Sequence, residues 1–373
     1  MDLSSEDALR LNVLLANKPQ AIRIDESAMV VYGLSDQGQA KVPLNPVGRD
    51  EQYLKKVREL LSGQVTGSPG GYPVFLKRWT RMGQMRDQSL KQLLLLGEPE
   101  AVAAVCSSGI TDELARRAWW AMEGPENARH MLASPAVVSG KMGSILAIYL
   151  IDYLPFETET EIMMESVRLV LQPGLIDDRT RLELWRKATR KQAYLVGFLT
   201  ATPDDLPDLA PPHPRLEQAR AALDGLDAVG NPIAQQLLRA LSAPGQTFLK
   251  TVRSVLKKPP TQDVVTAALD AVRAYFQPLR PEGDPDLTLE QLDAEAQTRF
   301  GPDGPEDARA CLAAAGEFSE ALRAMLVLSG LGYGVVRPVF RKTTAIGSLM
   351  RRKLEPVMEP LGERIETLLG NAR

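Results

Sequence analysis

The chain has 373 residues, of which 44% are hydrophobic and 24% are charged, and its formal net charge is −3. This length exceeds the size at which one hydrophobic core keeps growing, so we expect two or three domains. The charge excludes a globally basic nucleic-acid-binding protein, although a local basic patch could still bind RNA. Two cysteines, Cys106 and Cys311, are too few for a disulfide framework and fit a reducing compartment.

Residues 1–66 predict a small α+β domain. A capped helix is expected over residues 7–16, and three apolar residues share one of its faces: Leu9, Val13 and Ala16. Alternating apolar and polar residues then predict an antiparallel meander of three short strands, over residues 21–26, 29–32 and 39–44. A three-stranded sheet needs a cover on its apolar face, and a helix expected over residues 50–62 can supply it.

Residues 67–202 predict a helical array. Short apolar stripes at helical spacing are separated by glycines and prolines, and short helices with tight loops must lie antiparallel to their neighbours. Longer helices are expected near the end of this segment, over residues 142–153, 159–171 and 179–199. The predicted middle of the protein is therefore an α-solenoid-like stack of helical hairpins.

The composition changes at residues 203–214, which read PDDLPDLAPPHP. Acidic and proline-rich stretches of this kind are typical of stiff linkers. Helical patterns resume over residues 215–373, which we expect to form a second helical domain. The predicted fold class is mainly α, with a small antiparallel β-meander at the N-terminus.

Residues 72–86 combine cations with aromatic rings, in the order Tyr72, Phe75, Lys77, Arg78, Trp79, Arg81 and Arg86. Cations attract phosphate while rings stack on bases, so this composition suits single-stranded RNA as well as an anionic protein partner. The alternative is a helix that packs Phe75 and Trp79, four residues apart, into a core and leaves its cations in water.

A second group of cations lies in one predicted helix: Arg179, Arg181, Arg186, Lys187, Arg190 and Lys191. Acids at its start and cations toward its end suit the helix dipole, which explains part of the pattern. If both basic runs shared a face, they would form a positive surface.

Adjacent Trp119 and Trp120 point about 100° apart on a helix, so one can be buried while the other, with Arg116 stacked on it, binds a partner. The candidate partner-binding residues are Tyr72, Lys77, Arg78, Trp79, Arg81, Trp120, Arg186 and Arg190.

The sequence predicts no catalytic residues, cofactor or metal site. His130 and His213 lack second ligands at metal spacing. Cys106 ends an apolar helix, where the dipole disfavours a thiolate, and Cys311 has no activating motif. The glycine-rich loop at residues 67–71 lacks the lysine and hydroxyl of a nucleotide-binding loop, which favours a simple turn.

The N-terminus lacks the pattern of a signal peptide, and the apolar run at residues 324–336 is shorter than a membrane span and contains three glycines. We therefore expect a soluble cytoplasmic protein that does not bind membranes. The sequence leaves its oligomeric state open.

Several strings in the first 200 residues resemble the DsrS family, which is encoded with the reverse dissimilatory sulfite reductase pathway of sulfur-oxidising bacteria. They read LSSEDALRLNVLLAN, GSPGGYPVFLKRWTRMGQMRD, LLLLGEPEAVAAV, TDELARRAWWAM and SVRLVLQPGLID. The resemblance implies a cytoplasmic accessory or regulatory role in the oxidation of stored sulfur, with no catalytic residues to transfer.

Three functional hypotheses follow. The first is a non-catalytic protein that binds a partner from the sulfur-oxidation pathway through a helical surface. The second is an RNA-binding regulator that uses residues 72–86. The third is a sulfur carrier that uses Cys106 or Cys311, because sulfur pathways pass persulfides between cysteines.

Overall fold

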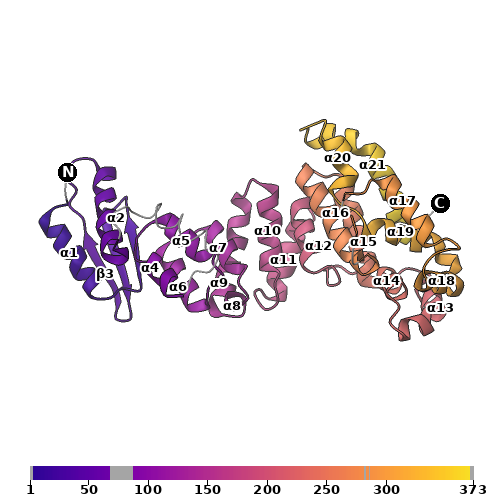
Figure 1. Ribbon diagram of the computed structural model, residues 1–373, viewed down its shortest axis with the longest axis horizontal. Coiled ribbons are helices and arrows are strands. Elements are labelled where there is room, and N and C mark those ends of the chain that lie inside the picture. Colours follow the sequence, from indigo (N-terminus) through magenta and orange to yellow (C-terminus); the bar gives the residue numbers. More distant parts are fainter. Residues whose placement is uncertain (1–2, 68–86, 281–282, 285, 370–373) are drawn as a thin grey trace. The chain divides into compact units, whose positions relative to one another are not determined.

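The computed structural model describes residues 3–67, 87–280, 283–284 and 286–369. Within these ranges the chain is mainly helical, with one three-stranded antiparallel sheet near the N-terminus, which confirms the predicted fold class (Figure 1). Two compact units are present. Unit 1 contains Met1–Pro155 and Gln172–Ile176, and unit 2 contains Phe156–Leu171 and Asp177–Arg373. The domain boundaries expected from the sequence do not coincide with this division and stay a prediction.

The sheet of unit 1 has the order β1-β2-β3, with both neighbouring pairs antiparallel. Its strands are β1 (Ala21–Asp25), β2 (Val30–Ser35) and β3 (Gly38–Pro43). The predicted meander is therefore confirmed, although β2 runs further toward its turn than the alternation suggested. The register places Arg23 opposite Tyr32, so two long side chains lie side by side on one face of the sheet.

Two helices, α1 (Ser5–Ala16) and α2 (Asp50–Thr66), share a hydrophobic core with the sheet (Figure 1). The face of α1 predicted from its apolar spacing is turned to solvent, since Leu9 and Val13 are 65% and 54% exposed. The buried face instead follows the spacing i, i+4 and i+7, through Asp7, Leu11 and Leu14. The buried face of α1 therefore includes a carboxylate, and it differs from the face that apolar spacing alone predicted.

The carboxylate of Asp7 is fully buried and is surrounded by donors. Its Oδ2 accepts the backbone N–H of Asn45 at 2.8 Å and the hydroxyl of Tyr53, and its Oδ1 accepts the side-chain amide of Asn45 at 3.1 Å. Burial opposes ionisation, but these hydrogen bonds and one involving Ser4 outweigh it and hold the pKa of Asp7 below its usual value. This network joins α1 to α2 and to the segment after β3.

Short helices continue unit 1 after the sheet: α4 (Asp87–Leu93), α5 (Pro99–Cys106), α6 (Asp112–Ala121), α7 (Pro125–Leu132), α8 (Pro135–Val138) and α9 (Lys141–Tyr153). Thr111 caps α6, because its hydroxyl accepts the N–H of Leu114 at 3.4 Å. Asp112 in turn accepts the first N–H groups of α9, from Lys141 and Met142. A side chain of α6 thus fixes where α9 begins.

One long helix expected over residues 179–199 is in fact two helices, α11 (Asp178–Ala188) and α12 (Gln192–Ala201). The prediction was wrong because the two halves bury different amounts of surface. Helix α11 buries one side, whereas α12 buries all seven residues from 193 to 199. The chain leaves the helical conformation at residues 189–191, between these two differently buried halves.

Unit 2 also contains the proline-rich stretch that the sequence marked as a linker. In the structure this stretch packs on its surroundings: Asp204 forms an ion pair with Arg239, and Asp208 accepts the indole N–H of Trp185 at 2.9 Å. The backbone N–H of His213 donates to the carbonyl of Leu241. Proline content predicted stiffness, but it carried no information about these contacts.

The remaining elements of unit 2 pack around a core that includes Phe248 and Tyr275, whose rings are stacked with centroids 4.0 Å apart. They are α10 (Thr160–Val170), α13 (Leu216–Ala228), α14 (Pro232–Leu241), α15 (Ala243–Lys257), α16 (Gln262–Phe276), α17 (Leu289–Arg299), α18 (Glu306–Ala314), α19 (Ser319–Ser329), α20 (Tyr333–Phe340) and α21 (Gly347–Leu368).

In the described part of the chain, no single helix combines the length and apolar character that crossing a membrane requires. One bent pair, Gly316–Ser329 with Tyr333–Phe340, meets those criteria of length and composition when its two arms are taken together, and the arms make an angle of 67°.

Candidate partner-binding groove

Most of the partner-binding residues predicted from the sequence cannot be placed. Tyr72, Lys77, Arg78, Trp79 and Arg81 lie outside the described residues, so the hypothesis of RNA binding by residues 72–86 stays a prediction.

The second basic run begins on α11 and ends just after it, at Lys191, and it is partly neutralised. Arg181 forms an ion pair with Asp205 at 2.8 Å, and Arg179 pairs with Glu183. Arg186 and Arg190 are exposed, and no carboxylate of the described residues lies within 4.0 Å of either one. Together with the exposed Lys187, these two arginines form a small local group of positive charges.

The adjacent tryptophans of α6 point in different directions, as predicted. Trp119 packs edge-on against Tyr149 of α9, with ring centroids 4.7 Å apart. Trp120 is half-buried, and the guanidinium of Arg23 lies between its ring and that of Tyr32, about equally far from both, at 5.1 and 5.0 Å. Trp120 thus joins α6 to the sheet through a cation–π sandwich.

Arg116, the cation expected over Trp120, instead donates two hydrogen bonds to Glu113. The hydrogen bonds from Arg116, opposed by desolvation and assisted by Arg117, lower the pKa of Glu113 to about 2. The cation that stacks on Trp120 is Arg23 of β1, which lies about 100 residues earlier in the sequence. Helical spacing cannot indicate a partner at that separation.

Both cysteines are buried and chemically quiet. Burial raises the pKa of Cys106 to about 12, and burial together with the charge of Asp307 raises the pKa of Cys311 to about 11. The thiol of Cys311 contacts the amide oxygen of Asn231 at 3.4 Å. Neither environment favours the thiolate that sulfur transfer requires.

We expect both cysteines to be unreactive in the folded protein. At pH 8 the thiolate of a group with pKa 12 is about one part in ten thousand, and burial also blocks the reagent. A thiol reagent that releases a coloured product should therefore release almost none within minutes from the native protein. In denaturant it should release two equivalents of the product per chain. Rapid release of one equivalent in native buffer would contradict this assignment.

Among the described residues, no group of three His, Cys, Asp or Glu side chains is arranged to hold a metal ion. His213 is buried beside Arg215, and its Nδ1 accepts the backbone N–H of Arg215 at 3.0 Å. Burial, assisted by the charge of Arg215, lowers the pKa of His213, so its imidazole is neutral at pH 7. The Nδ1 atom of this histidine stabilises the local turn by accepting that hydrogen bond.

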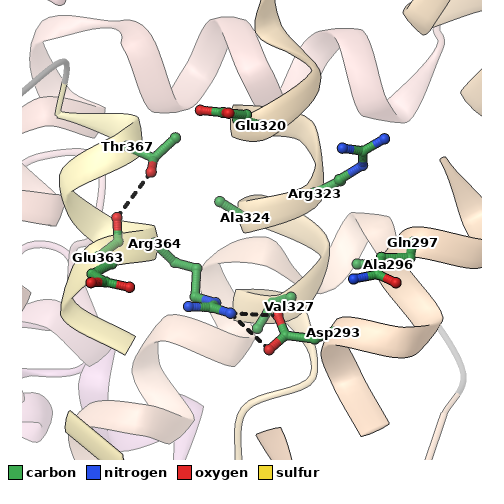
Figure 2. A pocket seen from close by; sticks show the side chains of 10 residues that line it. All are labelled: Asp293, Ala296, Gln297, Glu320, Arg323, Ala324, Val327, Glu363, Arg364 and Thr367. Carbon is green, nitrogen blue, oxygen red and sulfur yellow. Dashed lines mark hydrogen bonds and ion pairs between the residues drawn. The ribbon is translucent and has the colours of Figure 1, made fainter. Parts of the chain in front are cut away.

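Unit 2 contains a charged cleft of about 300 Å³ between α17, α19 and α21 (Figure 2). At its base Arg364 donates to both carboxylate oxygens of Asp293, each at 2.7 Å, and also to the carbonyl of Pro360 at 2.8 Å. Glu320, Arg323 and Glu363 line the rest. The charges of Arg364 and Asp293 neutralise each other, and their ion pair links α21 to α17.

A larger groove, of about 660 Å³, lies between α15 and α21. The two helices run antiparallel, as two widely separated hydrogen bonds show. The side-chain amide of Gln246, near the start of α15, donates to the carbonyl of Leu368 at the end of α21. Arg351, near the start of α21, donates to the carbonyl of Pro259 just after α15. Between these points Arg253 and Glu366 form an ion pair.

The groove has an apolar floor and charged walls. Its floor consists of buried or partly buried apolar side chains: Leu256, Leu354, Met358 and Ile365. Four cations gather where α15 ends and α21 begins: Lys257, Lys258, Arg351 and Arg352. No carboxylate of the described residues lies within 4.0 Å of the charged nitrogens of these four. Two further wall residues, Glu355 and Glu359, likewise have no cation within that distance in the described ranges.

Sequence reasoning missed this groove. The pairs Lys257-Lys258 and Arg351-Arg352 each look like an ordinary helix end, and they are separated by more than ninety residues. The sequence contained one signal for the groove, namely two pairs of adjacent cations on two amphipathic helices. Only the antiparallel packing of α15 on α21 brings the two pairs together.

Comparison with known proteins adds no assignment, since no family model, curated protein or solved structure matches the chain. The groove offers an apolar floor and, among the described residues, charges of both signs that have no ion-pair partner within 4.0 Å.

Proposed function

We propose that this protein is a non-catalytic accessory or regulatory protein that binds a partner protein through the α15–α21 groove. The observation that carries the proposal is the apolar floor of this groove, bordered by four cations without an ion-pair partner in the described ranges. Partner-binding surfaces typically combine a central apolar patch with a charged rim that sets specificity.

The resemblance to the DsrS family supports a biological setting for this binding. We infer that the partner takes part in the oxidation of stored sulfur and that the protein acts in the cytoplasm. The buried thiols with raised pKa values favour an accessory role over a cysteine-based sulfur carrier.

Site-specific photo-cross-linking tests this proposal. A photoreactive phenylalanine analogue replaces Met358, which lines the groove floor, in the full-length chain expressed in a sulfur-oxidising host. The matched control carries the same analogue at Val229, an apolar residue of unit 2 that is 78% exposed and does not line the groove. Irradiation should give a discrete adduct at position 358 that is absent at position 229.

Mass spectrometry then identifies the adduct, which we expect to contain a protein of the sulfur-oxidation pathway. The adduct should also weaken when Lys257 and Arg352 are both replaced by glutamate. The proposal fails if position 358 gives no adduct, or if positions 229 and 358 give the same set. An adduct with an unrelated protein would overturn the pathway assignment.

A further inference from the structure

The walls of the α15–α21 groove change character along its length. Its cationic end, at Lys257 and Arg352, is followed by the apolar floor and by the carboxylates of Glu355 and Glu359. Seven residues separate Arg352 from Glu359, which is about 10 Å along a helix that rises about 1.5 Å per residue. Glu355 lies only three residues beyond Arg352, so a ligand that fills the groove meets positive charge first and negative charge from one to two turns later.

We propose, on the basis of the partner binding proposed above, that the occupant is an amphipathic helix of the partner protein, with carboxylates at one end, an apolar stripe and a cation toward the other end. The groove extends along α21 from Arg351 to Glu366. Fifteen residues of helix span about 22 Å, so a helix of about four turns matches the groove. Docking an apolar helix face into a groove between two helices is a common mode of peptide recognition.

The side chains of the groove argue against a polyphosphate ligand. Glu355 and Glu359 would repel a run of phosphates that extended beyond the cationic end. Met358 in the floor is only partly buried, so it gains from an apolar partner that removes its remaining surface from water. A protein helix can supply both the carboxylates for the cations and the apolar stripe for the floor, whereas nucleic acid supplies only negative charge and base faces.

A pair of synthetic peptides tests this inference with the full-length chain. The first is a fluorescent helical peptide of 16 residues with three glutamates at one end, leucines spaced three and four residues apart, and one lysine at the other end. The second has the same leucines but exchanges glutamates for lysines and lysine for glutamate. Fluorescence anisotropy should show at least tenfold tighter binding of the first peptide, and its affinity should fall as salt rises from 50 to 500 mM.

Charge-reversal variants locate the binding site. Lys257 and Arg352 are both exposed, so the double variant Lys257→Glu/Arg352→Glu should fold normally by circular dichroism and weaken the first peptide at least tenfold. The control Arg168→Glu/Arg309→Glu makes the same change in charge on α10 and α18, at exposed positions that do not line the groove, and should alter the affinity less than twofold.

Three outcomes would overturn the inference: no binding of the first peptide, equal binding of both peptides, or an equal effect of the two double variants. Binding of the chain to vesicles of anionic phospholipid, lost in Lys257→Glu/Arg352→Glu while the peptides stay unbound, would assign the groove to a lipid surface instead. The cross-link at position 358 reports partner binding without assuming a helix, so the proposed function could survive the failure of this inference.

Discussion

Replacement of Asp7 by alanine is expected to lower the free energy of unfolding of unit 1 by about 4 kcal/mol. The change leaves the buried hydroxyl of Tyr53 without its acceptor, at a cost of about 1–3 kcal/mol, and removes two hydrogen bonds from the exposed Asn45, each worth about 1 kcal/mol. Hydrogen exchange measured by mass spectrometry should show loss of protection in peptides covering residues 5–61. Tyr53→Phe removes one donor together with its bond, so its effect should be smaller, about 1 kcal/mol.

The matched control is Glu6→Ala. Glu6 is the residue next to Asp7 on α1, but its ion pair with Arg10 is exposed, so the change should cost less than about 0.5 kcal/mol. Equal effects of Asp7→Ala and Glu6→Ala would show that the buried network does not anchor α1.

The network also predicts acid sensitivity. The pKa of Asp7 is lower in the folded chain than its usual value of 3.8, so the unfolded chain takes up the proton first as the pH falls. The stabilising contribution of Asp7 is therefore complete well above pH 3.8 and is lost progressively below it. The difference in stability between the wild type and Asp7→Asn should shrink across that window, and an unchanged difference would contradict the assigned direction.

Gly245→Ala is the second change with a large expected effect, and it should destabilise unit 2 by about 4 kcal/mol. A Cβ atom at this position would lie 2.1 Å from the carbonyl oxygen of Arg239 and 2.5 Å from that of Ala240. Both atoms belong to the backbone at the end of α14 and cannot move aside, so α15 would have to shift away from α14. Chemical denaturation followed by hydrogen exchange in α14 and α15 measures the loss.

Gly225→Ala is the matched control, because it makes the same substitution inside α13. A Cβ atom there meets nothing within 4 Å, so the higher helix propensity of alanine should stabilise unit 2 by about 0.5–1 kcal/mol. The two substitutions therefore have opposite expected signs. Stabilisation by Gly245→Ala would show that the close approach of α15 to α14 is not a constraint.

Local patterns in the sequence predicted many elements correctly. The alternation of residues indicated the β-meander, and the helices expected from residues 142 and 159 begin within one residue of those positions. These features depend on neighbours within a few residues, where backbone preference and capping decide. The prediction of one helix over residues 179–199 was wrong. Local periodicity does not show where a helix breaks between two halves that are buried to different depths.

Side-chain partners distant in sequence could not be predicted. Arg23 rather than Arg116 stacks on Trp120, and Arg364 pairs with Asp293, 71 residues earlier in the chain. Composition shows that such charges exist, but periodicity gives only the face of one helix at a time. Pairing needs the packing of whole elements against one another.

The sequence by itself determined the mainly helical character of this protein, its N-terminal meander and most of its helix starts, because these depend on interactions over a few residues. The tertiary structure alone decided that Asp7 faces inward and that two ordinary cation pairs meet at one end of the α15–α21 groove. Those outcomes depend on the antiparallel packing of distant helices and on desolvation, and neither is encoded in the spacing of residues along a single element.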